Sequence, residues 1–164
     1  METLHAQIER LCFTSKKAFD DVLAGLYRGI SRPNLDELKR QLERVHDLAE
    51  FAQIVNAAVG SVGLLEFLHL DLGAALRVGS LSHPYRMIRI IAGNPMIMRS
   101  MTQSVPAAGS YAPITILIYQ FGGEVYVCYD TLASLLAVYD STEARQIAEG
   151  LDKKVISLIE SAVK

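Results

Sequence analysis

Residues 114–130 read Ile-Thr-Ile-Leu-Ile-Tyr-Gln-Phe, then Gly-Gly, then Glu-Val-Tyr-Val-Cys-Tyr-Asp. β-Branched and aromatic residues dominate both runs, and two glycines between such runs are a strong signal for a β-hairpin. Glycine adopts the positive φ angles of a type I′ turn without steric cost. A two-residue turn also determines which residues face each other across the hairpin: Phe121 and Glu124, Tyr119 and Tyr126, Leu117 and Cys128.

Both faces of this hairpin are largely apolar. Side chains alternate along a strand, so one face carries the pairs Tyr119–Tyr126 and Leu117–Cys128. The other face carries Ile116, Ile118, Val125, Val127 and Tyr129. An apolar face has to be covered, so we expect helices against one side of the sheet and another molecule against the other.

The sequence predicts three further strands and two long helices around the hairpin. Apolar alternation favours strands over 4–13, 64–72 and 87–92. Apolar residues at helical spacing predict a helix from about 15 to 30 and a last helix from about 140 to 162. A turn is expected at Ser82-His83-Pro84.

Polar residues with capping potential mark where helices are expected to begin. Asn34 with Glu37, and Asp140 with Glu143, have the spacing of capping boxes. Asn94, which directly precedes a proline, is expected to cap a short helix.

The element order predicts an α+β fold. It is a β-α-β4-α arrangement, with an antiparallel sheet and long helices packed on one of its faces. Residues 33–59 form a helical insertion within it. A chain of 164 residues fits a single domain over 1–164.

Composition excludes several classes of protein. A hydrophobic fraction of 51% opposes disorder, and a net charge of −2 from 16 basic and 18 acidic residues opposes nucleic-acid binding. No apolar run approaches the roughly 20 residues that cross a bilayer, and the first residues lack a signal-peptide pattern. The two cysteines have no ligand spacing, so we expect reduced thiols in a cytoplasmic protein.

Short motifs between residues 64 and 130 match those of a known family in order and spacing. They are Gly93-Asn94-Pro95, a short helix with Met98 and Met101, the segment 108–113, and the hairpin with its Tyr129-Asp130 exit. Residues 67–75 are similar to a Phe-x-x-Ile-Asp-His-Ala segment, with Asp71 at the Asp position. The chain thus resembles the bacterial and archaeal family called domain of unknown function 302.

That resemblance implies a β-α-β4-α fold like one half of the TATA-box-binding protein, often dimeric, and no established activity. DNA binding does not transfer with the fold, because the charge balance opposes it. The chain departs from the family pattern at Leu72, where the family often has His. Its insertion over 33–59 is also longer than the usual connection.

His69 and Asp71 are the first candidate site. Two residues apart on one strand, their side chains project together about 7 Å apart. They could form an acid/base pair or part of a metal site. The simpler interpretation is a polar patch in which Asp71 caps the turn at Gly73.

Asn94 is the second candidate. Its simpler role is to cap a helix. The sharper hypothesis is that this helix N-terminus binds a carboxylate or phosphate with the help of Arg89 or Arg99.

Sulfur-containing and aromatic residues supply the remaining candidates. Cys128 is either a buried inert thiol or a nucleophile. The methionines Met87, Met96, Met98 and Met101 suggest core packing more than a redox or haem carrier. Tyrosines could line a pocket: Tyr111, Tyr119, Tyr126 and Tyr129.

These observations predict a homodimeric, cytoplasmic binding domain for a small, mostly apolar ligand or a partner protein, without metal or cofactor. Its predicted ligand-binding residues are Phe67, His69, Asp71, Asn94, Tyr119, Tyr126 and Cys128. We expect neither nucleic acid nor membrane as a partner. The alternative is a small hydrolase, isomerase or redox enzyme using His69, Asp71 and Cys128.

Overall fold

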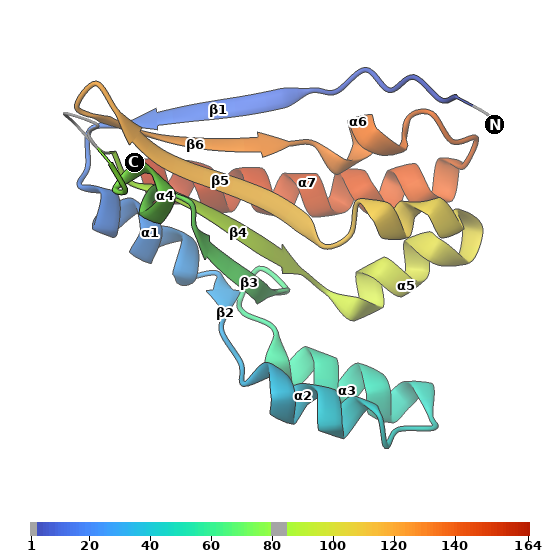
Figure 1. Ribbon diagram of the computed structural model, residues 1–164. Helices are drawn as coiled ribbons and strands as arrows, with labels where there is room; N and C mark the ends of the chain where they lie inside the picture. The colour runs from blue at the N-terminus through green and yellow to red at the C-terminus, as the bar shows by residue number, and fades with distance from the viewer. Residues whose placement is uncertain (1–2, 80–84) are drawn as a thin grey trace.

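A six-stranded sheet with helices against one of its faces makes up most of the structure (Figure 1). The structure is a computed structural model that describes residues 3–79 and 85–164. The turn predicted at Ser82-His83-Pro84 lies outside the described residues.

The strands follow the predicted α+β fold, with one addition. Their order in the sheet is β1-β6-β5-β4-β3-β2, and every neighbouring pair is antiparallel except β2 with β3. The bounds are β1 (Arg10–Ser15), β2 (Ile30–Ser31), β3 (Leu64–Asp71), β4 (Met87–Gly93), β5 (Ile114–Phe121) and β6 (Glu124–Asp130). Strand β2 was not predicted, because two residues are too few to show alternation.

The hairpin of β5 and β6 has the predicted bounds and register. Phe121 faces Glu124, and the pairs Tyr119–Tyr126 and Leu117–Cys128 follow. Gly122 and Gly123 have φ angles of 60° and 87°, as the tight turn requires.

The first strand was predicted too early in the chain. It begins at Arg10, which pairs with Asp130, the last residue of β6, so residues before Arg10 have no partner strand. It continues to Ser15, which pairs with Val125. The following helix α1 (Phe19–Tyr27) therefore begins four residues later than predicted.

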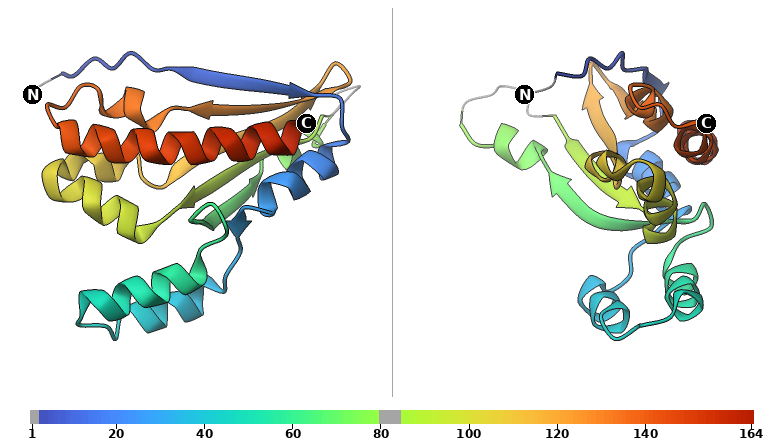
Figure 2. Two further views of the ribbon diagram at one scale, coloured as in Figure 1. Left: turned by 180° about the vertical axis from the view of Figure 1, so that it is seen from behind. Right: turned by 90° about the vertical axis from the view of Figure 1, so that its right-hand side faces the viewer.

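Helices α1, α5 (Pro95–Ser104) and α7 (Thr142–Val163) lie on the same side of the sheet (Figure 2). The predicted insertion is a helical hairpin, α2 (Leu35–Leu42) and α3 (Leu48–Ala58), which projects from the rest of the molecule. Short helices lie in the connections: α4 (Gly73–Leu76) between β3 and β4, the 3₁₀ helix η1 (Pro106–Ser110) between α5 and β5, and α6 (Leu132–Leu136) between β6 and α7. No helix within the described residues is long and apolar enough to span a membrane.

Helix caps agree with the sequence at Asn34 and Asn94 but not at α7. Asn34 accepts a hydrogen bond from the Glu37 amide. At α7 the cap is Ser141, whose Oγ accepts from the Ala144 amide at 3.2 Å, in place of Asp140. Ser141 has the extended backbone of an N-cap residue, with φ −143° and ψ 103°.

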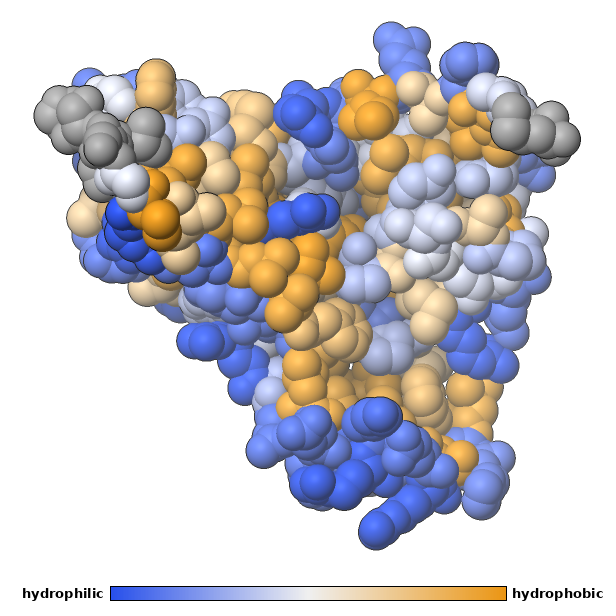
Figure 3. Space-filling model, in the orientation of Figure 1, coloured by the Kyte–Doolittle hydropathy of each residue, from blue (hydrophilic) through white to orange (hydrophobic). Residues whose placement is uncertain are grey.

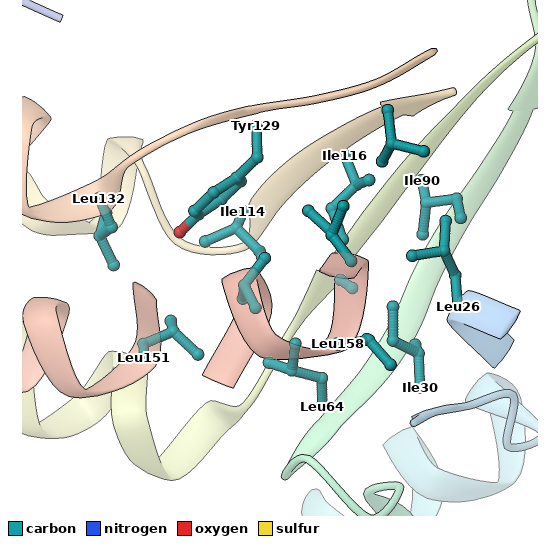
Figure 4. Close-up of a cluster of buried hydrophobic side chains, with 14 of the residues drawn as sticks. Leu26, Ile30, Leu64, Ile90, Ile114, Ile116, Tyr129, Leu132, Leu151 and Leu158 are labelled. Atoms are coloured by element: carbon teal, nitrogen blue, oxygen red, sulfur yellow. The ribbon is translucent and has the colours of Figure 1, made fainter. Parts of the chain in front are cut away.

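The core lies between the sheet and the helices. It is built from every second residue of the central strands and from the inner faces of α1 and α7 (Figure 4). Residues labelled there include Leu26, Ile90, Ile116, Tyr129 and Leu158, and each is at most 7% exposed.

One buried carboxylate joins this core to the α6 segment. Asp152 of α7 is 5% exposed and accepts hydrogen bonds from the backbone amides of Leu132 and Ala133 at 2.8 and 2.9 Å. The Tyr129 hydroxyl donates to the same carboxylate. Asp152 therefore caps a helix that has no capping side chain of its own.

We expect Asp152→Ala to lower the free energy of unfolding by about 2–4 kcal/mol, because it leaves buried N–H and O–H donors without acceptors. Urea denaturation followed by circular dichroism measures this. The control is Glu149→Ala, an exposed residue of the same helix, which should change stability by less than about 0.5 kcal/mol. Equal effects of the two substitutions would contradict this role of Asp152.

Candidate functional site

A groove that could hold a ligand lies on the face of the sheet away from the helices. Alternation along the strands puts Cys12, Arg89, Leu117 and Cys128 on this face. Figure 3 views it and shows hydrophobic side chains gathered over its middle, with hydrophilic ones among them.

A groove of about 720 Å³ opens on this face. Its floor comes from the strands and its ends from the segments around η1, α6 and the end of β3. The lining residues are Arg10, Cys12, Leu72, Met87, Arg89, Ser110, Tyr111, Pro113, Ile114, Thr115, Leu117, Tyr119, Cys128, Asp130, Leu132 and Leu135.

Two of the predicted ligand-binding residues line this groove, Tyr119 and Cys128. A third, Tyr126, stacks on Tyr119 with ring centroids 5.0 Å apart and planes 11° apart. The predicted hairpin register brings these rings together.

Cys128 is not a free thiol. It lies directly opposite Cys12 on β1, and the two form a disulfide. The prediction of reduced thiols is therefore wrong, and Cys128 does not offer a nucleophile in this state. The cytoplasmic location loses that support and stays a prediction. Sequence spacing could not reveal the pair, since it depends on β1 lying beside β6.

His69 belongs to a different site, because a β-bulge changes the face on which it lies. The pairing of β3 with β4 shifts between Glu66 and Leu68, so Phe67 is the extra residue. Simple alternation would put Glu66 and His69 on opposite faces of the strand. The bulge puts both on the face that the helices cover, where they meet Tyr27 of α1.

Glu66 is the centre of a polar cluster that sequence analysis missed. It is 9% exposed, and its carboxylate accepts hydrogen bonds from the Tyr27 hydroxyl and, at 3.3 Å, from Arg32 Nε. The Arg32 guanidinium also lies over the Tyr27 ring, 4.8 Å from its centroid. A glutamate inside the run Leu-Leu-Glu-Phe-Leu was the available signal, because a buried charge needs partners.

The hydrogen bonds of this cluster determine where the proton of neutral His69 lies. The Tyr27 hydroxyl donates its one proton to Glu66, so its oxygen, 2.8 Å from His69 Nδ1, acts there as an acceptor. Nδ1 of the neutral imidazole therefore carries the proton and Nε2 does not. The His69 side chain is 31% exposed.

A smaller hollow of about 440 Å³ lies beside this cluster. Phe67 and His69, two of the predicted ligand-binding residues, line it together with Arg32 and Glu66. These residues lie at the edge of the sheet formed by β2 and β3.

Asp71 and Asn94 have structural partners. Asp71 accepts from the Ala74 amide at 3.0 Å and pairs with Arg77 at 2.5 Å, and the Arg77 hydrogen bond holds the pKa of Asp71 below its usual value. Asn94 Oδ1 accepts from the Met96 amide at 2.8 Å, and its Nδ2 donates to the Gly63 carbonyl at 2.9 Å. The side chain of Asn94 thus takes the helix amide that an anion would use.

The positions of the side chains give no support to a metal site or to a redox or haem-carrier role of the methionines. Among residues 3–79 and 85–164, no three His, Cys, Asp or Glu side chains are grouped so that they could hold a metal ion. Met101 is fully buried, Met98 is 36% exposed, and Met87 lines the groove.

A family model and a solved structure each match most of the chain. A family model described as domain of unknown function DUF302 matches residues 38–162. A crystal structure of an uncharacterized conserved protein DUF302 from Bacillus stearothermophilus is similar, with a TM-score of 0.63 and 11% sequence identity. The match covers 94% of this chain and 98% of that one. At this identity the likeness shows the fold alone. None of the curated proteins compared with the chain matches it.

We expect Tyr27→Phe to lower the free energy of unfolding by about 1–2 kcal/mol, because it removes a hydrogen bond to a buried carboxylate. Tyr119→Phe is the matched control, since its ring lies in the groove on the other face. Urea denaturation at pH 7.5 compares the two. A loss no larger for Tyr27→Phe than for Tyr119→Phe would contradict the proposed role of the hydroxyl.

The raised pKa of the Tyr27 hydroxyl predicts a loss of stability at alkaline pH. Burial, and then the hydrogen bond to Glu66, raise the pKa of Tyr27 above its usual value near 10. Above about pH 10 the unfolded state ionises first, so stability is complete below that pH and falls above it. Urea denaturation from pH 8 to 11 should show a shallower decline for Tyr27→Phe than for the parent protein.

Proposed function

The chain belongs to the domain of unknown function DUF302 family, and we propose that it acts as a homodimeric binding domain for a small, mostly apolar molecule. The ligand lies in the groove on the face of the sheet away from the helices. The groove itself is the observation on which this proposal rests.

The size and lining of the groove suit a small organic molecule. Its volume of about 720 Å³ falls within the roughly 300–1,000 Å³ of ligand pockets. Leu117 and Met87 provide an apolar floor, and Leu132 and Leu135 lie at one end. Nine of the sixteen lining residues are apolar and seven carry polar groups, so the groove offers both apolar contact and groups that can orient a ligand.

Exposed leucines beside the groove support the homodimer. Leu68 and Leu72 are 48% and 38% exposed; Leu68 lies on the face that carries the groove, and Leu72 lines the edge of the groove itself. A second copy of the chain placed over them removes apolar surface from water and closes the open side of the groove. Ligand binding and dimerisation then use adjoining parts of one face.

The alternative, a small enzyme using His69, Asp71 and Cys128, has less support. His69 lies on the helix-covered face and Cys128 on the other. Asp71 is held by Arg77, and Cys128 is bonded to Cys12. The three residues therefore do not converge on one substrate.

Nile red, a neutral apolar dye, tests the groove directly. We expect its fluorescence to rise on binding, and Leu117→Gln to weaken binding roughly tenfold, since the apolar contact of a leucine contributes about 1.5 kcal/mol. The control is Leu48→Gln, the same change in the projecting α2–α3 hairpin. No binding by the parent protein, or equal binding by both variants, would contradict the proposal.

Dimerisation is tested by light scattering coupled to gel filtration. We expect a dimer at micromolar concentration and a shift to monomer in Leu68→Glu, because the substitution puts a charge into the buried interface. Leu48→Glu is a closely matched control, as Leu48 and Leu68 are both 48% exposed. A monomeric parent protein, or a dimer unaffected by Leu68→Glu, would exclude this interface.

A further inference from the structure

Arg89 is a cation in the middle of an apolar surface. On the sheet it lies directly between Leu70 of β3 and Leu117 of β5. Along its own strand, Met87 and Ile91 are the next residues on the same face. All four nearest positions on this face are therefore apolar. Arg89 is exposed, so it places a solvated charge on a surface that the rest of the strand pattern keeps hydrophobic.

The Arg89 guanidinium has only a weak partner within the part of the chain that the structure describes. Its Nη2 donates to Thr115 Oγ1 at 3.3 Å, which uses one of five N–H donors. No carboxylate among residues 3–79 and 85–164 lies within ion-pair distance of it. Of the residues outside these ranges, 80–84 (Ser-Leu-Ser-His-Pro) contain no carboxylate, and the one side-chain carboxylate is that of Glu2.

The second arginine of the groove is different. Arg10 Nε and Nη2 donate to the two oxygens of Asp130 at 2.6 and 2.8 Å. That fork pairing neutralises Arg10. Two cations and one carboxylate line the groove, so its net charge is +1, and this charge resides on Arg89.

Charge and lining together identify a class of ligand. We propose, building on the binding function proposed above, that the groove holds an amphipathic organic monoanion whose carboxylate pairs with Arg89. Guanidinium donors match a carboxylate in a bidentate pair. A single uncompensated cation suits one negative charge better than the two of a phosphate monoester.

The groove supplies partners for both parts of such a molecule. Ser110, Tyr111 and Thr115 bring hydroxyl groups to the lining, and these can donate to carboxylate oxygens. The apolar part of the ligand then lies along Leu117 and Met87, which flank Arg89 on the sheet. Apolar contact supplies affinity, and Arg89 supplies orientation and selectivity for an acid.

Displacement of Nile red from the full-length protein tests this proposal with three probes of one chain length: decanoate, decanol and decyltrimethylammonium. We expect decanoate to displace the dye at a concentration at least about tenfold below that of decanol, as a charge-assisted hydrogen bond predicts. The cationic probe should be the weakest.

Arg89→Met should remove the preference for decanoate over decanol. The concentration of decanol that displaces the dye should change less than about threefold. Arg89→Lys, a second variant, should retain part of the preference, since it keeps the charge without the fork. The matched control is Arg145→Met, an exposed arginine of α7 on the other side of the sheet, which should leave all three probes unchanged.

The possible failures are distinguishable. If decanoate and decanol displace Nile red equally from the parent protein, or if Arg89→Met keeps the preference, the monoanion proposal is wrong and the binding function stands. If the dye and all three probes fail to bind in the groove, the binding function itself is wrong, and the ligand class is overturned with it.

Discussion

A sheet that is apolar on both faces, with helices on only one, is the constraint on which the rest of this structure depends. Ile116 and Tyr129 of the hairpin are buried against the helices, and this burial supplies the hydrophobic free energy that holds the fold together. Leu117 and Tyr119 of β5 lie on the other face and line the groove. The groove, the exposed leucines beside it and the proposed second copy are all consequences of that unequal coverage.

Three charged residues lie among apolar neighbours in the folded structure, and their partners distinguish structural roles from the proposed functional one. Asp152 caps α6 and accepts from Tyr129, so its charge is used within the fold. Glu66 is likewise satisfied by Tyr27 and Arg32. Among residues 3–79 and 85–164, the only hydrogen-bond partner of the Arg89 side chain is the Thr115 hydroxyl. Arg89 is exposed and solvated in the free protein, so its charge is available to pair with a ligand, which is the role proposed for it above.

Strand β1 completes the groove and is tied to β6 in two ways on that same face. The disulfide joins Cys12 to Cys128, and two residues away the Arg10 guanidinium pairs with Asp130. These links hold an edge strand that has a neighbour on one side only. The disulfide also removes the Cys128 thiol that the sequence offered as a nucleophile, and the ion pair compensates the charge of Arg10.

Local features could be predicted from the sequence because neighbouring residues determine them. Alternation and the diglycine turn predicted the hairpin over 114–130 to the residue, and Asn94 was correctly predicted as a helix cap. Pairing over long separations could not be predicted. Cys12 and Cys128 are 116 residues apart and meet only because β1 lies beside β6. The bulge at Phe67 reverses the alternation that would have separated Glu66 from His69. Strand order and a one-residue shift in pairing depend on which strands lie side by side. Only the tertiary structure therefore decided them.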